Sequence, residues 1–403
     1  MFGVGWGANQ FTSLIVAYHH DRGITVGTDE ALFGIYALGL IPALLVGGPA
    51  SDRWGRARVV RPAAVLSVVA TVLLMFGSHR LPLLFAGRFV AGAVSGAVFA
   101  AGTAWVKELS VPPFDITAGE QAGARRSAIA LSLGFGLGPL VAGILAQWSP
   151  DPLVVPYLPH LVVMAVVLPG LWRVPETVVA HTGGGGSFRQ QLRVPLVRHP
   201  RFVWLVVPVA QWVFAAAAVS FAVLPTVISS RTSGYGVAFA GVVAGVTLGV
   251  GVGVQPLARQ LDRTGAARGA MAGLAAVTVG MVVAALAAHL LSPPLVLVAG
   301  AVLGAGYGCC LVAGLLEVQR LAGPDDLAGL TAVFYALTYL GFAVPVVLAE
   351  LNHRASYPVQ LLALAGLAAV CLAVVATRSG RWDEGRETVP GLKTRLDPSD
   401  FET

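Results

Sequence analysis

GGPASDRWGRARVVR, residues Gly47–Arg61, is the stretch that decides the fold of this chain. About twenty apolar residues precede it and about twenty follow it, so it forms a short loop between two membrane spans. Gly55 gives the backbone the freedom that a tight reversal at the membrane surface requires. The cluster of arginines predicts that the loop faces the cytoplasm, where basic residues of membrane proteins are retained.

The composition requires a membrane. Of the 403 residues, 56% are hydrophobic and 11% are charged, which is less than half the charged share of a soluble domain. The lipid bilayer is therefore the expected partner of the apolar surface. The net charge of +6 is interpreted as cytoplasmic basic bias, not as affinity for nucleic acid. All three cysteines lie in apolar runs and are interpreted as packing residues: Cys309, Cys310 and Cys371.

Hydrophobic runs long enough to cross a bilayer predict twelve transmembrane helices in two sets of six. The first set lies near 2–19, 31–50, 59–78, 81–106, 127–148 and 153–172. The second lies near 202–228, 236–257, 268–290, 293–316, 327–350 and 357–377. The expected fold is an all-α integral membrane protein with two six-helix halves, at 1–172 and 202–377. A cytoplasmic linker at 173–201 joins the halves, and a cytoplasmic tail follows at 378–403.

The linker contains a flexible run of glycines, Gly183–Gly186, and then Ser187–Arg193, which predicts a short basic amphipathic helix at the lipid headgroups. Basic residues set the orientation. With both ends in the cytoplasm, the inner segments carry 21 of the 26 lysines and arginines, and the outer loops carry four: Arg22, Arg80, Arg231 and Arg354. Met1 lies almost inside the first span with no basic residue before it, which favours a native start further upstream.

The two halves repeat short patterns. Asp262-Arg263-Thr264-Gly265 follows Asp52-Arg53-Trp54-Gly55 by 210 residues, at the same place between spans. The glycine pairs of spans 4 and 10, at 92 and 96 and at 304 and 308, are 212 residues apart. Pro139 and Pro345 are 206 apart in spans 5 and 11. Three similar offsets predict a duplicated six-helix unit.

The loop resembles the first signature of the major facilitator superfamily, Gly-x-Leu-Ala-Asp-Arg-x-Gly-Arg-Lys. Five of its eight fixed positions match: Gly48, Asp52, Arg53, Gly55 and Arg56. The alternative is a basic hairpin of some other polytopic protein, and the repeat in the second half speaks against it. The resemblance implies a twelve-helix transporter in which this loop and its repeat, Asp262, Arg263 and Gly265, control conformational change.

Arg88 lies about two turns below the outer end of span 4, where burying its charge costs up to roughly 2.5–3.5 kcal/mol. The segment resembles the superfamily's span 4 signature, which implies an arginine that faces the central cavity and assists proton transfer. The matching position in span 10 is Gly300, so packing does not demand an arginine. The alternative is a side chain that reaches the outer headgroups.

Span 5 carries a glycine and proline pattern that resembles the signature of the antiporter branch of the superfamily. It consists of Gly134, Gly138, Pro139 and Gly143, with Ala142 in place of a further glycine. The spacing lets a neighbouring helix approach closely, and the proline removes a backbone donor. This resemblance implies efflux.

A few polar side chains within the spans are candidates to line a substrate cavity, with interhelical hydrogen bonding as the alternative for each. They are Asn9, Gln10, Tyr36, His160, Gln211, Tyr307, Tyr335 and Tyr339. Asp and Glu are absent from the middle of the predicted spans, a departure from exporters that carry a carboxylate in span 1. Glu317 is expected to pair with a nearby base.

Nucleotide loops and metal or hydrolase motifs are missing from the sequence, so neither an enzyme nor a cofactor is expected. The chain is interpreted as a monomeric transporter of the plasma membrane that works by alternating access, exporting a small molecule against proton entry. Two rivals remain open: a proton-coupled importer or facilitator of a metabolite, and a membrane scaffold or sensor that transports nothing.

Asp52 is expected to act as a conformational latch. If the halves pack as in this superfamily, its loop lies next to the start of span 11, near Asp325-Asp326-Leu327. A carboxylate at a helix N-terminus gains roughly 0.3–1 kcal/mol. That contact would bridge the halves on the cytoplasmic side, and pairing of Asp52 with Arg53 or Arg56 would release it. The alternative is a hairpin in which only the basic residues matter, by setting the topology.

Overall fold

The computed structural model describes residues 1–24, 26–77, 80–118, 122–178, 195–261, 267–322 and 327–383. These residues are nearly all helical, and no strand occurs among them. The predicted linker features at Gly183–Gly186 and Ser187–Arg193 lie outside this range, as do Asp262, Arg263 and Gly265.

Among the described residues, eleven helical segments are long and apolar enough to cross a membrane, judged by length and composition. The first predicted span is a twelfth that is broken into α1 (Phe2–Asn9), the 3₁₀ turn η1 (Thr12–Leu14) and α2 (Ile15–Arg22). The prediction of a twelve-helix membrane fold is thus confirmed.

The remaining spans of the first set are single helices. They are α3 (Val26–Trp54), α4 (Arg56–Gly77), α5 (Leu81–Leu109), α6 (Ala122–Trp148) and, after the 3₁₀ turn η2 (Val155–Tyr157), α7 (Leu158–Arg173).

The second set contains more interrupted spans, and it follows the short turn η3 (Pro195–Arg198). Its first span joins η4 (Phe202–Val206), α9 (Val207–Ala218), η5 (Val219–Val223) and α10 (Leu224–Val227), in which η4 and η5 are π-helical. After η6 (Ser229–Arg231) come α11 (Gly236–Gly253) with α12 (Gln255–Leu261), α13 (Arg268–Leu290) and α14 (Pro293–Leu321). The last two spans are α15 (Leu327–Tyr339) with η8 (Leu340–Ala343) and α16 (Val344–Leu351), and α17 (Tyr357–Asp383).

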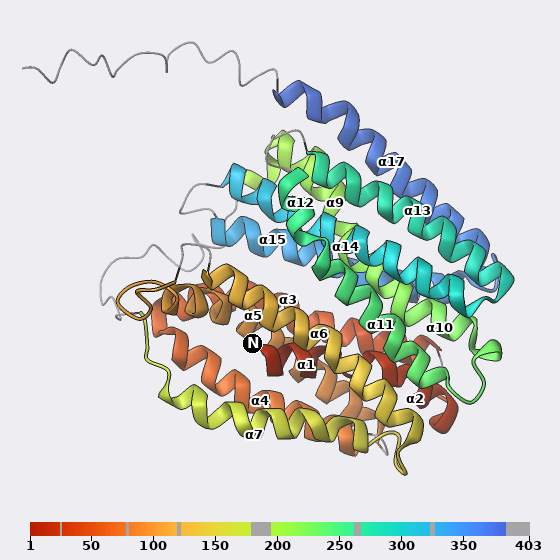
Figure 1. The fold of residues 1–403 in the computed structure, drawn as a ribbon, viewed down its shortest axis with the longest axis horizontal. Helices are drawn as coiled ribbons and strands as arrows, with labels where there is room; N and C mark the ends of the chain where they lie inside the picture. The colour runs from red at the N-terminus through yellow and green to blue at the C-terminus, as the bar shows by residue number, and fades with distance from the viewer. Residues whose placement is uncertain are drawn as a thin grey trace, which may run out of the picture.

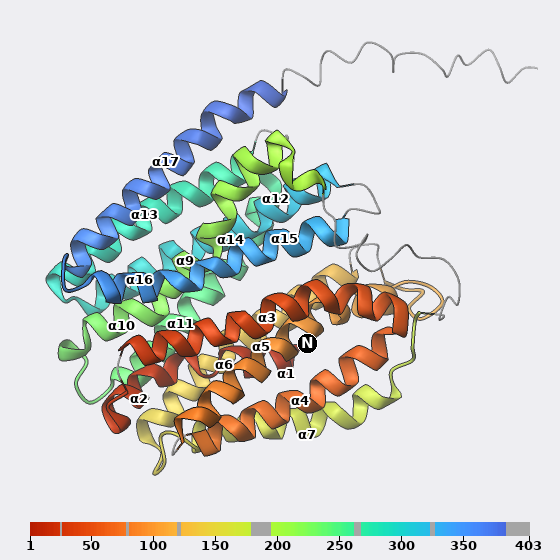
Figure 2. The same ribbon diagram turned by 180° about the vertical axis from the view of Figure 1, so that it is seen from behind.

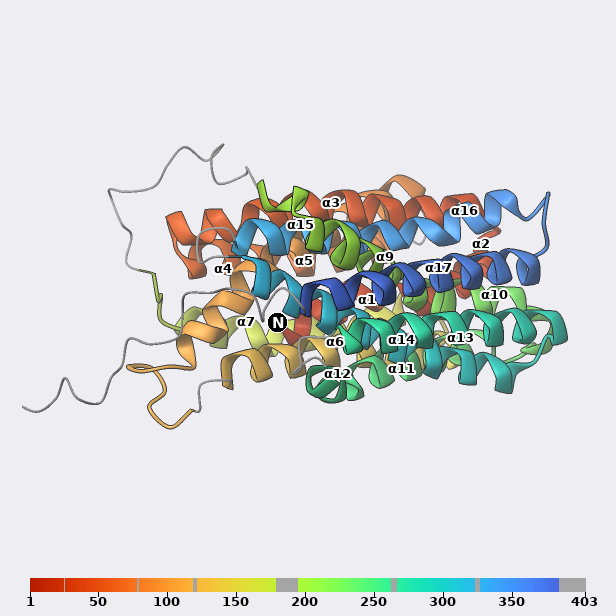
Figure 3. The same ribbon diagram turned by 90° about the horizontal axis from the view of Figure 1, so that it is seen from above.

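The helices form two groups that lie side by side (Figures 1 and 2). The first group runs from α1 to α7 and the second from α9 to α17. Seen from above, the helices of both groups run along a common direction (Figure 3), as a bundle that crosses a bilayer must. The groups meet where α6 packs on α11 and where α3 packs on α15, η8 and α16.

Glycines set the helix spacing at equivalent positions of the two groups. In α5, Gly92 and Gly96 face the backbone of α3, at Tyr36 and Leu40. In α14, Gly304 and Gly308 face the backbone of α11 in the same way. A methyl group at any of these glycines would collide with main-chain atoms, so the small residues are what allows the close packing.

Three spans are interrupted, and for two of them, spans 1 and 11, the local sequence accounts for the interruption. Span 1 breaks at Gln10 within a polar run of Asn, Gln, Thr and Ser, residues that compete with the helical backbone for hydrogen bonds. Span 11 passes through η8 just before Pro345, which lacks an N–H donor. Span 7 contains η5, and π-helical turns of this kind are frequent at functional sites.

Candidate functional site

Gly55 makes the reversal between α3 and α4. Its φ is +107°, a conformation that residues with a side chain rarely adopt. A Cβ atom at this position would lie 2.5 Å from Oε2 of Glu176. Glycine is therefore required twice, for the backbone angle and for the close approach of Glu176.

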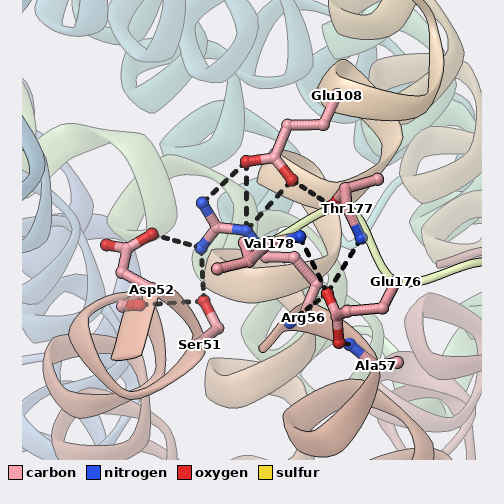
Figure 4. A network of polar contacts seen from close by, with 9 residues as sticks. Ser51, Asp52, Arg56, Ala57, Glu108, Glu176, Thr177 and Val178 are labelled. Carbon is pink, nitrogen blue, oxygen red and sulfur yellow. Dashed lines mark hydrogen bonds and ion pairs between the residues drawn. The ribbon is translucent and has the colours of Figure 1, made fainter. Parts of the chain in front are cut away.

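Arg56 begins α4 and is the centre of a polar network (Figure 4). Its guanidinium lies 2.5 Å from Asp52 and 2.8 Å from Glu108, and it donates to Oγ of Ser51 at 2.6 Å. Arg56 is buried, whereas the side chain of Asp52 remains 57% exposed. These ion pairs tie the end of α3 and the start of α4 to the end of α5.

Glu176, in the segment after α7, caps the start of α4 (Figure 4). Its two carboxylate oxygens accept the backbone N–H groups of Arg56 and Ala57, each at 2.9 Å. Burial alone would raise the pKa of Glu176, but four backbone donors, at Val178, Ala57, Arg56 and Thr177, together lower it. The hydroxyl of Thr177 donates to Glu108, which closes the network.

The end of the molecule that carries this network is called the motif face below. The side chain of Asp52 is paired with Arg56 there, which is the released arrangement of the predicted latch. Residues 323–326, before the helix it was expected to contact, lie outside the described part of the chain. The other matching residues are Arg53, which is exposed, and Gly48, where an added Cβ would meet no described atom within 4 Å.

Arg88 lies inside the first helix group. Its side chain is 1% exposed, so it does not reach the membrane surface as the alternative required. It donates to the backbone carbonyls of Leu32 at 3.2 Å and Ala8 at 3.3 Å. Aromatic rings surround the guanidinium carbon, with centroids at 4.4 Å for Tyr36, 4.7 Å for Phe11 and 5.5 Å for Phe33.

The rings around Arg88 continue into the second helix group. Phe33 stacks on Phe342 of η8 with centroids 5.9 Å apart, and Phe342 stacks on Phe214 of α9 at 4.9 Å. Phe214 also stacks on Tyr339 at 4.6 Å and lies near Tyr307 at 5.9 Å. This aromatic cluster therefore joins the interrupted spans 1, 7 and 11, which resembles the way that broken helices form binding sites in transporters.

The predicted cavity residues fall into separate places. The four tyrosines lie in or beside the aromatic cluster: Tyr36 contacts Arg88, Tyr307 and Tyr339 contact Phe214, and Tyr335 contacts Phe334. His160 and Gln10 instead join an interhelical cluster in the first group, where Nδ1 of His160 lies 2.8 Å from Oγ1 of Thr71 and the amide of Gln10 donates to the same hydroxyl at 3.1 Å. Asn9 is half-buried, and Gln211 contacts the sulfur of Cys371.

The face opposite the motif face is closed by α6 and α11, and is called the clamp face below. A Cβ at Gly143 would lie 2.9 Å from Cα of Gly241, so the two helix backbones touch. Gln147 then clamps the start of α11. Its Oε1 accepts the N–H groups of Val237 at 3.1 Å and Ala238 at 3.2 Å, and its Nε2 donates to the carbonyl of Gly234 at 2.9 Å.

The same two helices separate toward the motif face. At Gly245, one step along α11, an added Cβ would reach only the side chain of Leu140, at 3.6 Å. At Gly249 and Gly253 it would meet no described atom within 4 Å. The remaining span 5 glycines, Gly134 and Gly138, face α1 at Phe2 and Trp6 instead.

Glu317 pairs with Arg201 at 2.8 Å and contacts Arg320, as expected from the sequence. The sequence reasoning missed the aromatic cluster, the clamp residue Gln147 and both acidic partners of Arg56. One signal was present for the last of these. Two carboxylates, Glu108 and Glu176, directly follow predicted spans at the face where the basic loop lies.

A family model matches the sequence of this chain, and solved structures share its fold. The family model of the Major Facilitator Superfamily matches residues 1–346. No curated protein matches the sequence. A crystal structure of the nucleoside transporter NupG has a TM-score of 0.70 at 13% identity, covering 93% of this chain and 95% of that one.

Two further structures are similar. A POT family transporter in complex with 5-aminolevulinic acid has a TM-score of 0.77 at 14% identity, covering 94% of this chain and 95% of its own. The human organic anion transporter MFSD10 has a TM-score of 0.65 at 16% identity, covering 93% and 97%. The chain belongs to the Major Facilitator Superfamily and is a multi-pass membrane transporter, not an enzyme.

Proposed function

We propose that this protein is a secondary active transporter of the plasma membrane that works by alternating access and exports a small molecule in exchange for protons. One observation carries the proposal. The backbones of α6 and α11 touch at Gly143 and Gly241 on the clamp face, whereas at Gly249 and Gly253, toward the motif face, no described atom lies within 4 Å of an added Cβ. Two helix groups whose facing helices touch at the clamp face and separate toward the motif face can rock about the aromatic cluster between them.

The motif face is proposed to be cytoplasmic, with both termini on that side. The support is the basic bias, 21 lysines and arginines on that side against four on the other. The arrangement described here would then be open toward the cytoplasm. The ion pair between Asp52 and Arg56 fits this state, because a latch carboxylate held by Arg56 cannot also bridge the two groups.

Arg88 is proposed to serve the proton coupling. A fixed positive charge lowers the proton affinity of any acidic group beside it, and so promotes proton release at that point of the cycle. Efflux is supported by the span 5 pattern, in which Gly143 brings α6 against Gly241 of α11. Solved transporters of this fold that carry nucleosides or peptides support a small organic molecule as the substrate class.

Proteoliposomes with an imposed pH gradient test this function. Purified protein is screened with metabolites and drugs, and substrate flux is recorded together with the internal pH. Arg88→Lys should keep partial proton-driven flux and Arg88→Ala should abolish it, while both variants insert, because the insertion cost of a buried charge is reduced or unchanged. Wild-type coupling in Arg88→Ala would contradict the role of Arg88.

The direction of flux separates the proposal from a proton-coupled importer or facilitator. Substrate that accumulates with the proton gradient would favour import, and flux without proton movement would favour a facilitator. A scaffold or sensor would give no flux and no exchange between states.

A further inference from the structure

Arg88 is a buried cation without an acidic partner among the side chains that the structure describes. Its two hydrogen bonds both go to main-chain carbonyls. Other arginines differ: Arg56, which is buried, pairs with Asp52 and Glu108, and Arg201, which is partly buried, pairs with Glu317. An uncompensated buried charge is costly, so the site around Arg88 is electrostatically incomplete.

The free donors of Arg88 have a defined geometry. A guanidinium carries five N–H groups in one plane. The bonds to Leu32 and Ala8 use Nε and Nη1, and Nη2 makes no hydrogen bond within the described part of the chain. The edge formed by Nη1 and Nη2 can therefore hold both oxygens of one carboxylate, the bidentate arrangement that arginine favours.

The surroundings of the guanidinium are aromatic. Tyr36, Phe11 and Phe33 lie within 5.5 Å of its carbon. Their cation–π attraction offsets only part of the buried charge, about 0.5–2 kcal/mol for each favourable contact. Phe33 stacks on Phe342 of the second helix group, so the aromatic surroundings of Arg88 extend to the other half of the transporter.

The second helix group supplies no competing charge at the equivalent place. Gly300 is the residue that matches Arg88 in the repeat. It faces the side chains of Ser220 and Thr247, whose hydroxyl oxygens lie 2.7 Å apart. Glu317 is already engaged by Arg201 on the motif face. A cationic substrate would thus meet a like charge with no described carboxylate to hold it.

We propose that Arg88 binds the anionic group of the substrate, and that the transported molecules are organic carboxylates with an apolar, preferably aromatic body. The carboxylate would lie on the Nη1–Nη2 edge of Arg88, and the body would lie among Phe11, Phe33 and Phe342. This inference rests on the proposed transport function and adds the charge of the substrate to it.

Matched acids and amides test the inference by binding, without a transport assay. Benzoate, phenylacetate and indole-3-acetate are compared with benzamide, phenylacetamide and indole-3-acetamide at pH 7.5, using the melting temperature of the purified full-length protein and equilibrium binding. At least one acid should stabilise the wild type and bind at least about tenfold more tightly than its amide, since bidentate charge-assisted bonds are roughly twice as strong as neutral ones. Arg88→Gln should remove this difference, and Arg354→Gln, at an exposed arginine, should keep it.

Arg88→Lys keeps the positive charge but loses the planar guanidinium that can bind both oxygens of a carboxylate. The acid should therefore bind about tenfold less tightly, while the affinity for the amide is unchanged. This variant decides the question if Arg88→Gln does not fold. Equal binding of acids and amides, no stabilisation by any acid of the series, or a difference that survives at Arg88→Gln would overturn the anion assignment. None of these results would contradict alternating access, because that mechanism is tested independently, by measuring distances between the two helix groups.

Discussion

Gly55 is the residue whose replacement has the most direct structural consequence. Its positive φ and the nearby Glu176 carboxylate both exclude a side chain. Gly55→Ala should therefore lower the free energy of unfolding by about 1–2 kcal/mol or more. The melting temperature of the purified protein measures this change. Gly48→Ala is the control near the end of α3, where open space surrounds the residue and alanine suits a helix, so no loss of stability is expected.

Glu176 makes the stability of the motif face depend on pH. Its pKa is lowered in the folded protein, so its stabilisation is present above the unfolded value of about 4.3 and is lost as the pH falls through the lower folded value. Between about pH 5 and pH 3, the melting temperature of the wild type should fall more steeply than that of Glu176→Gln. Parallel curves for the two proteins would show that the carboxylate is not held by the α4 backbone.

Single residues were predictable from the sequence where one residue type is rare in its surroundings. Arg88 stands out in an apolar span, and Gly55 stands out in a charged hairpin. The partners of these residues were not predictable. Phe11, Phe33 and Phe342 are ordinary apolar residues of membrane spans, and only the packing of distant segments places Phe11 and Phe33 at Arg88 and Phe342 against Phe33.

The contact between α6 and α11 is the element on which the conformational state depends. Gly143→Ala would place a methyl group 2.9 Å from Cα of Gly241 and should destabilise the closed clamp face by about 1–3 kcal/mol. The measurement is the rate at which Ala238→Cys, at a buried position at the start of α11, reacts with a membrane-impermeant maleimide, which should rise as the clamp face opens. Gly136→Ala, in open space on the same helix, should leave the rate unchanged. Equal rates in both variants would contradict a clamp at Gly143.

Most elements follow from hydrophobic length, because a bilayer allows few backbone solutions other than long helices. α13 and α14 begin at the predicted residues. The interruptions in spans 1, 7 and 11 could not be predicted in the same way. A 3₁₀ or π turn costs little where neighbouring helices satisfy its free backbone groups, so tertiary packing decides where such turns form.

The orientation of the whole molecule is the next testable property. Single cysteines at Gly184→Cys and Ser233→Cys, in a protein without Cys309, Cys310 and Cys371, should react oppositely with an impermeant reagent applied to intact cells. Ser233→Cys should react from outside, and Gly184→Cys only after the membrane is opened, because the basic bias places the linker in the cytoplasm. External labelling of both positions would contradict twelve spans with both ends inside.

The central claim is that the two helix groups alternate between openings at the clamp face and at the motif face. Distances between spin labels in proteoliposomes test it without a known substrate, using double electron–electron resonance. One pair, Trp148→Cys with Ser233→Cys, reports the clamp face, and a second, Arg125→Cys with Gln260→Cys, reports the motif face on the same two spans. All four positions are exposed.

Both pairs are measured in the background without native cysteines, with and without Gln147→Ala. Removing the Gln147 clamp should lengthen the clamp-face distance and shorten the motif-face distance, because the same two helix groups cannot be apart at both ends. Distances that stay fixed in both pairs, or that change in the same direction, would contradict alternating access and favour a rigid membrane scaffold.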